Sequence, residues 1–216
     1  MNDFHDMDAV ILANGDYPSA SLPLRILKEA PYVVCCDGGA NEYIAKGYLP
    51  DVIIGDGDSL SQENRIKYAS LICYNPDQET NDQTKAIQYL LAQGKRRIAI
   101  VGATGKREDH TIGNMSLLME YARTYDLEGM GVEVEMITDH GSAFAVTDTF
   151  EMDCGTGRKV SIFSPDNSLR IHSEGLEWPL DNVVFDNWWK ATLNKASADR
   201  VRLEFSHSSI ALIMLD

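Results

Sequence analysis

The first 140 residues alternate between short apolar runs and segments with helical periodicity, and this alternation restricts the fold more than any other feature. The apolar runs have the length of buried strands, and they cover Ala9–Ala13, Tyr32–Cys36, Val52–Ile54, Leu71–Tyr74, Arg97–Val101 and Val132–Thr138. The predicted helices lie near Leu22–Glu29, Asn41–Lys46, Ser61–Ala69, Asp82–Ala92 and Thr111–Tyr125. Such an order predicts an α/β, Rossmann-like domain: a mostly parallel sheet with helices on both faces.

The pattern changes after about residue 140. The remaining segments are short and β-like, separated by Gly, Pro, Asp, Asn and Ser: Ala143–Val146, Phe150–Met152, Lys159–Phe163, Ser168–His172, Asn182–Phe185, Val201–Phe205 and Ile210–Leu215. Only the stretch around Trp188–Ala196 is ambiguous. We therefore predict two domains, an α/β domain over residues 1–140 and an all-β sandwich or partial barrel over residues 141–216.

Two carboxylates follow the third predicted strand, in the string Gly55-Asp56-Gly57-Asp58-Ser59. Glycine lets the backbone adopt conformations that other residues avoid and lets a ligand approach closely. Carboxylate oxygens suit a hard cation such as Mg²⁺, which in turn binds substrate phosphates. This string favours a metal-assisted phosphate site.

Similar loops follow the other predicted strands of the first domain. The five loops begin with Asn14-Gly15-Asp16, Asp37-Gly38-Gly39-Ala40-Asn41, Gly55–Ser59, Asn75-Pro76-Asp77-Gln78 and Gly102–His110. Each loop alone is more typical of an ordinary turn than of a ligand site, since Asp and Asn bond nearby backbone and Gly accepts positive φ. In a parallel sheet, however, all five open onto the edge where ligands bind. Their coincidence predicts one shared site for an anionic ligand and a metal.

The loop Gly102-Ala103-Thr104-Gly105 is the candidate phosphate loop, because glycine-rich backbone before a helix can present N–H groups to phosphate. It matches neither GxGxxG nor GxxxxGK[ST]. Lys106 and Arg107 add positive charge there, and Lys85 lies on the helix that a capping box at Thr80–Gln83 predicts. His110 follows Asp109 at a helix start, but no GxSxG motif supports a hydrolase triad.

The composition excludes several classes of partner. The chain has 216 residues, is 44% hydrophobic and has a net charge of −14, which argues against binding to a nucleic-acid backbone. No apolar stretch is typical of a membrane span, and Met1–Asp6 lacks the features of a signal peptide. The cysteines Cys35, Cys36, Cys73 and Cys154 form no CxxC pair, so a zinc site is not expected. A reducing cytoplasm is the simplest expected location.

Several of these motifs, taken in order and spacing, resemble the thiamine pyrophosphokinase family. The strings that carry the resemblance are Asp37–Asn41, Gly55–Ser59, Asp77-Gln78 with Asp82 and Lys85, Gly102–His110, and Gly175-Leu176-Glu177-Trp178-Pro179-Leu180. The resemblance covers nearly the whole chain. It implies an N-terminal α/β domain, a C-terminal β domain and a homodimer with active sites at the subunit interface. The implied reaction is a Mg²⁺-dependent transfer of pyrophosphate from ATP to the hydroxyethyl oxygen of thiamine, releasing AMP.

The resemblance also implies roles for individual residues. Asp56, Asp58 and Asp82 would hold Mg²⁺, and together with Asp109 they are the candidate catalytic residues. The implied ATP-binding residues are Asp37, Gly38, Lys85, Gly102, Thr104, Gly105, Arg107, Asp109 and His110. The implied thiamine-binding residues are Gln78, Thr192 and Asn194, and the neighbouring Trp188 and Trp189 are added as candidates because their rings can stack on thiamine. No residue is assigned as the base that accepts the hydroxyl proton.

The chain departs from the family pattern at a few positions. Ala191-Thr192-Leu193-Asn194 aligns with a family segment Ser-Thr-Ser-Asn, so two hydroxyls are lost, and Trp188 and Trp189 offer stacking instead. Lys106 stands where the family often has glycine, and Asn81 where it usually has threonine. Two other functions stay open: a pyrophosphokinase for another alcohol such as a hydroxymethylpterin, and a non-catalytic sensor of nucleotide or thiamine diphosphate.

Overall fold

Residues 7–216 are described by a computed structural model, in which the chain divides into two units. The predicted absence of a signal peptide rests on Met1–Asp6, which lies outside the described residues. One unit contains the described residues up to Leu117 together with Gly129–Asp139, and the other contains Leu118–Glu128 together with His140–Asp216. We call them the α/β unit and the β unit.

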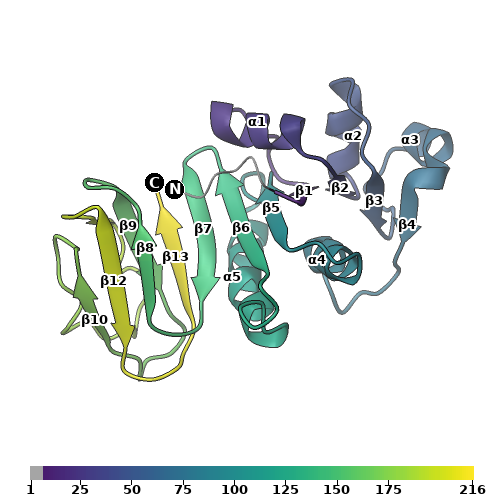
Figure 1. The fold of residues 1–216 in the computed structure, drawn as a ribbon. Helices are drawn as coiled ribbons and strands as arrows, with labels where there is room; N and C mark the ends of the chain where they lie inside the picture. Colours follow the sequence, from purple (N-terminus) through teal and green to yellow (C-terminus); the bar gives the residue numbers. More distant parts are fainter. Residues whose placement is uncertain (1–6) are drawn as a thin grey trace. The chain divides into compact units, whose positions relative to one another are not determined.

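The α/β unit is built on a parallel sheet in the order β6-β5-β1-β2-β3-β4 (Figure 1). Its strands are β1 (Ala9–Leu12), β2 (Val33–Cys36), β3 (Val52–Gly55), β4 (Ile72–Tyr74), β5 (Arg97–Val101) and β6 (Glu133–Thr138). The central strands are buried along their whole length, as expected for a sheet that is covered on both faces. The predicted fold class is confirmed for this unit.

The helices are α1 (Ser21–Glu29), α2 (Gly39–Ala45), α3 (Gln62–Lys67), α4 (Asp82–Ala92) and α5 (Glu108–Thr124), with a 3₁₀ turn at Ala69–Leu71. Helices α1 and α2 cover one face of the sheet and α4 the other (Figure 1). Helix α4 buries Ala86, Ile87 and Leu90, the apolar face that the sequence predicted. Its cap differs from the prediction, because Asn81 accepts the Thr84 N–H whereas Thr80 bonds Asp77.

The strand order reverses at β1. The chain runs from β1 outward through β2, β3 and β4, and then returns to place β5 on the other side of β1. The connections that leave β1 and β5 therefore diverge to opposite faces, and in open parallel sheets ligands bind at the carboxyl edge beside such a point. The loops after β1 and β5 lie at this switch point.

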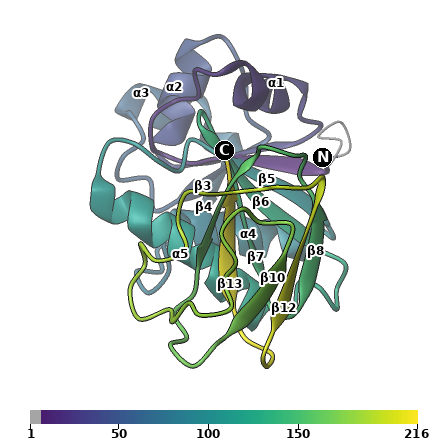
Figure 2. The ribbon, with the colours of Figure 1, turned by 90° about the vertical axis from the view of Figure 1, so that its left-hand side faces the viewer.

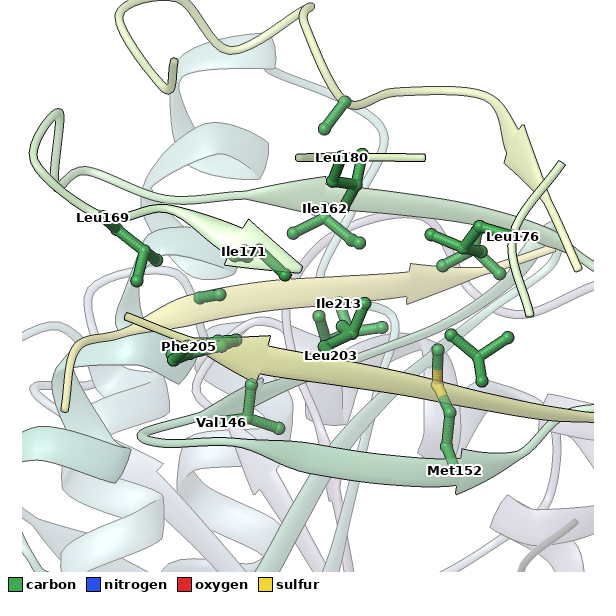
Figure 3. Packing of buried hydrophobic residues seen from close by; sticks show 14 of the residues in the cluster. Val146, Met152, Ile162, Leu169, Ile171, Leu176, Leu180, Leu203, Phe205 and Ile213 are labelled. Carbon is green, nitrogen blue, oxygen red and sulfur yellow. The ribbon is translucent and has the colours of Figure 1, made fainter. Parts of the chain in front are cut away.

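The β unit contains two antiparallel sheets, in the orders β11-β9-β13-β7 and β10-β12-β8. Figure 2 shows β7 and β13 of the first sheet and β8, β10 and β12 of the second. The strands are β7 (Gly141–Val146), β8 (Phe150–Asp153), β9 (Lys159–Phe163), β10 (Ile171–Glu174), β11 (Asn194–Lys195), β12 (Arg200–Phe205) and β13 (Ala211–Leu215). Alternate residues of both sheets point inward and form one apolar core, as Ile162, Ile213, Leu203 and Phe205 show (Figure 3). The predicted C-terminal β architecture is confirmed.

One predicted strand is wrong. Asn182–Phe185 forms no strand: the Val183 N–H bonds the Leu180 carbonyl in a turn, and the chain continues through Phe185 without regular structure. Leu180 and Phe185 are nevertheless buried in the core of the β unit. The apolar pattern therefore reported burial, which a covering turn provides as well as a strand does.

No helix in the part of the chain that the structure describes is both long and apolar enough to cross a membrane. The four cysteines are all unpaired, and Cys35 and Cys36 are buried as small apolar residues on β2.

The core of the β unit gives a test of its energetics. We expect Leu203→Ala to lower the free energy of unfolding by about 2–5 kcal/mol, because Leu203 is fully buried between the two sheets. The matched variant Leu193→Ala removes a side chain that is 73% exposed, so its effect should stay within about 0.5 kcal/mol. Chemical denaturation followed by tryptophan fluorescence reports on this unit, which contains all three tryptophans. Equal losses in the two variants would contradict the assigned core.

Candidate active site

Three carboxylates from two neighbouring loops converge at the carboxyl edge of the parallel sheet. Asp37 follows β2, and Asp56 and Asp58 follow β3. One carboxylate oxygen from each lies within 4.8 Å of the others. Asp37 is buried and Asp58 is exposed, so the cluster reaches from the sheet to solvent. Like charges this close repel one another unless a cation or bound protons neutralise them.

Asp37 is the constrained member of the cluster. Its backbone has φ +33°, in the left-handed region that side chains other than glycine seldom adopt. Its Oδ2 accepts the Ser59 N–H at 2.9 Å, whereas its buried Oδ1 has no hydrogen-bond partner within residues 7–216. Burial raises the pKa of Asp37 to about 6, and the Asp58 and Asp82 carboxylates add to this effect. The unpartnered Oδ1, close to other carboxylates, is therefore suited to bind a cation.

Asp82 opens α4 beside this cluster but lies outside the group of three. Its Oδ1 accepts a bond from the buried Lys85 Nζ at 3.1 Å. Burial raises the pKa of Asp82, although the Lys85 hydrogen bond acts against it. Gly55 makes this approach possible, since a Cβ there would lie 2.8 Å from Asp37 Cβ and 3.1 Å from Asp82 Oδ2. The structure thus brings Asp82 and Lys85 to the cluster as a pair.

The loop after β4 reaches the same cluster through Gln78. The Gln78 Nε2 donates to Asp56 Oδ2 at 2.9 Å, and this bond lowers the pKa of Asp56. Its neighbour Asp77 turns away and binds Thr80 and the Glu79 N–H. Gln78, which the sequence predicts to bind thiamine, is therefore already in contact with Asp56, a candidate metal ligand.

The loops after β1 and β5 are joined at the switch point. The Gly15 N–H bonds the Gly102 carbonyl at 2.7 Å, and the Asp16 N–H bonds the Thr104 carbonyl at 2.8 Å. A Cβ on Gly15 would lie 2.3 Å from the Thr104 oxygen, so only glycine permits this contact. Gly102 and Gly105 have φ of +65° and +77°. The predicted phosphate loop is a tight turn packed against the first loop.

The charged residues at the start of α5 pair with one another. Arg107 donates to Asp109 with both Nε and Nη2, the first at 3.0 Å to Oδ1. The same Oδ1 accepts the His110 N–H at 2.9 Å. This ion pair lowers the pKa of Asp109 and is exposed to solvent. Arg107 and Asp109 therefore lie just after the candidate phosphate loop, where each is the ion-pair partner of the other.

Two residues near the site were not singled out from the sequence. Asn114 of α5 donates to the Ala103 carbonyl at 2.8 Å and accepts from Asn81 Nδ2, which links the phosphate loop to the start of α4. Arg65 of α3 places its guanidinium 3.8 Å from where a Cβ on Gly57 would lie. Neither belongs to a motif, since each is brought in by its helix, and no local pattern would have identified it.

The predicted thiamine-binding residues of the β unit differ in how accessible they are. Trp188 and Trp189 are 49% and 68% exposed. The Thr192 hydroxyl donates to the Trp189 carbonyl at 2.7 Å. Asn194 is buried, donates to the Trp178 carbonyl at 2.6 Å and accepts the Trp178 and Lys195 N–H groups. Thr192 and Asn194 therefore hold backbone, whereas the two tryptophans present free ring surface.

The match to known proteins extends over both units. The family profile "Thiamin pyrophosphokinase, catalytic domain" matches residues 24–128, and "Thiamin pyrophosphokinase, substrate-binding domain" matches residues 141–211. Thiamine pyrophosphokinase 1 of Arabidopsis thaliana is 33% identical over 203 residues, which span 81% of this chain and 73% of that protein. This chain belongs to the thiamine pyrophosphokinase family. It is an enzyme of the pyrophosphotransferase class.

Other relatives agree with the family. Thiamine pyrophosphokinase 1 of Oryza sativa subsp. japonica is 26% identical over 211 residues, covering 79% of this chain and 76% of that protein. The solved thiamin pyrophosphokinase of Candida albicans has a TM-score of 0.77 at 20% identity, covering 99% of this chain and 91% of that one. The Bacillus subtilis enzyme has a TM-score of 0.76 at 18% identity, with 96% and 98% covered. These structures share the fold.

The raised pKa of Asp37 predicts how stability depends on pH. A carboxyl that holds its proton more tightly in the folded state than in the unfolded state stabilises the fold at low pH. This stability is lost as the pH rises from the unfolded value of 3.8 through about 6. We expect Asp37→Asn, measured without divalent cations, to be more stable than the natural chain at neutral pH, with the difference shrinking toward about pH 4. Thermal unfolding in EDTA across this range measures it.

Asp56→Asn is the matched control, because the pKa of Asp56 is shifted in the opposite direction from that of Asp37. The Gln78 hydrogen bond lowers the pKa of Asp56, so its ionised form is favoured in the folded state. This variant should therefore gain no stability at neutral pH. If Asp37→Asn and Asp56→Asn behave alike, the unfavourable burial of the Asp37 charge is not the cause.

Proposed function

We propose that this chain is a Mg²⁺-dependent thiamine diphosphokinase. It transfers pyrophosphate from ATP to the hydroxyethyl oxygen of thiamine and yields thiamine diphosphate and AMP. The observation that supports this most is the convergence of Asp37, Asp56 and Asp58 at the carboxyl edge of the sheet, next to a glycine-rich loop. The family implies thiamine and ATP as the substrates, and we propose that the metal–triphosphate complex binds at the carboxylate cluster.

The residues present fit Mg²⁺. Oxygen ligands in a cluster open to solvent suit this cation, which keeps several waters and takes few carboxylates. The buried Asp37 Oδ1 has no partner within the described chain, so it has a free lone pair. We propose Asp56, Asp58 and Asp82 as metal ligands, with Asp37 as a further oxygen donor beside them. Bound there, Mg²⁺ would neutralise charge on the triphosphate.

The ATP side of the proposed site is the loop from Gly102 to His110. Backbone N–H groups of Gly102, Thr104 and Gly105 are proposed to face the phosphates, and Gly38 lets the nucleotide approach the β2 loop closely. Arg107 would exchange its Asp109 partner for a phosphate, which offers the same bidentate geometry. Lys85 holds Asp82 in place, and His110 extends the loop at the helix start.

The residues of the chain are proposed to position the two reactants and to stabilise the negative charge of the triphosphate. The thiamine hydroxyl oxygen attacks the β-phosphorus as its proton passes to an acceptor that is left unassigned. The bond from that phosphorus to the oxygen bridging to the α-phosphate breaks, and AMP departs with this oxygen. Positioning and electrostatic stabilisation supply most of the catalysis in such transfers. Gln78 is proposed to orient the aminopyrimidine of thiamine while its amide contacts Asp56.

The β unit is proposed to provide the remaining thiamine contacts. Exposed indole rings offer flat, electron-rich faces that suit a cationic aromatic ligand. Trp188 and Trp189 are proposed as these platforms, and Thr192 and Asn194 as the residues that hold the turn bearing them. Residues 1–140 would thus serve ATP and metal, and residues 141–216 thiamine and dimerisation. A homodimer and a cytoplasmic location, where the four free cysteines persist, complete the proposal.

The reaction itself gives the first test. Purified protein with Mg²⁺, thiamine and ATP should form AMP and thiamine diphosphate in equal amounts. Production of ADP instead, or turnover with a hydroxymethylpterin but not thiamine, would reject the proposal. Tight binding of thiamine diphosphate or nucleotide without turnover would indicate a sensor. Light scattering measures the oligomeric state of the same sample.

We expect Asp58→Ala to lower kcat by at least about 10²-fold, the scale of losing a main electrostatic stabiliser. The control is Glu63→Gln, which removes an exposed charge on α3 and should leave kcat unchanged. Near-normal turnover in Asp58→Ala would remove Asp58 from the site.

We expect Trp189→Ala to raise the KM for thiamine about tenfold while the KM for ATP stays constant, because stacking on an exposed ring contributes about 0.5–2 kcal/mol. Trp189→Phe retains a flat ring and should recover most of the loss. A matching rise in the KM for ATP would point to a general disturbance of the fold instead.

A further inference from the structure

Lys106 occupies a strained position in the phosphate loop. Its backbone has φ +53°, and it directly follows Gly105 at φ +77°. A side chain in this region costs conformational free energy that glycine would not incur. Such a backbone outlier is a reason to look for a function of the side chain, since glycine would build the same turn at lower cost.

The Lys106 ammonium is fixed at the switch point between β1 and β5. Its Nζ donates to the Asn14 carbonyl at 3.1 Å and to Asn14 Oδ1 at 3.2 Å. The Asn14 amide in turn packs on Gly38, where a Cβ would lie 2.5 Å from Asn14 Nδ2 and 3.0 Å from Ser59 Cβ. The Asn14 side chain therefore connects the ammonium to the loop that carries Asp37, which in turn packs against Ser59 of the GDGDS string.

Lys106 differs from the nearby basic residues in its ion pairing. Lys85 is paired with Asp82, and Arg107 with Asp109. Within residues 7–216 no carboxylate lies within ion-pair distance of Lys106, although the chain carries a net charge of −14. An ammonium has three N–H donors, and Asn14 occupies two of them. One donor and a full positive charge remain for an anion.

From this arrangement, and resting on the proposed function, we infer that Lys106 binds the phosphate chain of ATP. Asn14 holds the exposed ammonium at the switch point, where nucleotide phosphates approach an open parallel sheet. A lysine serves there as a point charge, so its contribution is electrostatic and not tied to one geometry. Asn14 is the positioning residue for this contact.

The test compares Lys106→Gly, Lys106→Met and Lys106→Arg. We expect Lys106→Gly and Lys106→Met to raise the KM for ATP and the calorimetric Kd for ATP by about tenfold, the scale of one charge-assisted hydrogen bond. The KM for thiamine should stay constant. Lys106→Arg should keep most of the ATP affinity because it keeps the charge. The matched control Lys28→Met removes an exposed lysine in the last turn of α1 and should change neither constant.

Stability separates this role from a structural one. Lys106→Gly should unfold at a higher temperature than the natural chain, because glycine relieves the positive φ, and yet bind ATP more weakly. A purely structural lysine would give a Lys106→Gly variant with unchanged ATP affinity, and this result would overturn the inference. Equal weakening in Lys28→Met would overturn it too.

The inference and the proposed function fail in different ways. If the natural chain forms no AMP from ATP and thiamine, the proposed reaction is wrong, but calorimetry with ATP still tests Lys106. Loss of ATP affinity in Lys106→Met would then support the phosphate contact on its own. If the natural chain turns over and Lys106→Met retains its Kd for ATP, only the role of Lys106 is rejected.

Discussion

The arrangement of the site depends on one unfavourable interaction, the close approach of carboxylates at the end of two parallel strands. Asp37 is buried with one oxygen unpartnered, and its φ of +33° places it off the favoured backbone regions. The parallel sheet makes this possible, because its hydrogen-bonded strands hold the ends of β2 and β3 together whatever charges follow them. A site of this kind lowers the stability of the free chain through charge repulsion, and a bound cation that relieves the repulsion restores this stability.

Glycine decides how closely the loops approach. A side chain at Gly15 would collide with the phosphate loop, one at Gly38 with Asn14, and one at Gly55 with Asp37. These close contacts connect the loops of neighbouring strands, one to the next, along the carboxyl edge of the sheet. The site is therefore a property of the whole sheet edge, and its polar residues are held mainly by backbone and by short side chains. Lys106 is the exception, because there a long side chain takes a position that suits glycine.

In the β unit, one set of residues holds the backbone in place and another set presents exposed side chains. Asn194 is saturated by the backbone of Trp178 and Lys195, and Thr192 by that of Trp189, while the indole rings remain open. A polar residue within a binding motif can thus act by fixing a turn, and the residue next to it can present the contact surface. The loss of two hydroxyls, at Ala191 and Leu193, fits this division: Ala191 is buried in the core, and Leu193 stands 73% exposed at φ +56°.

The sequence by itself determined the class of fold, the change from α/β to β architecture, and the family. Strand and helix periodicities are local, and the loop motifs are contiguous, so both can be read without knowing any contact. Asp56, Asp58 and Gln78 were identified in this way, and in the structure Asp56 lies close to Asp58 and accepts a hydrogen bond from Gln78. Only the tertiary structure decided which charges are already paired, as Arg107 is by Asp109 and Lys85 by Asp82. It also brought in Arg65 and Asn114, and the contact between Asn14 and Lys106, all of which depend on strand order and helix placement. Turn geometry decided the rest, because an apolar run such as Asn182–Phe185 reports burial, and the chain can bury its residues without forming a strand.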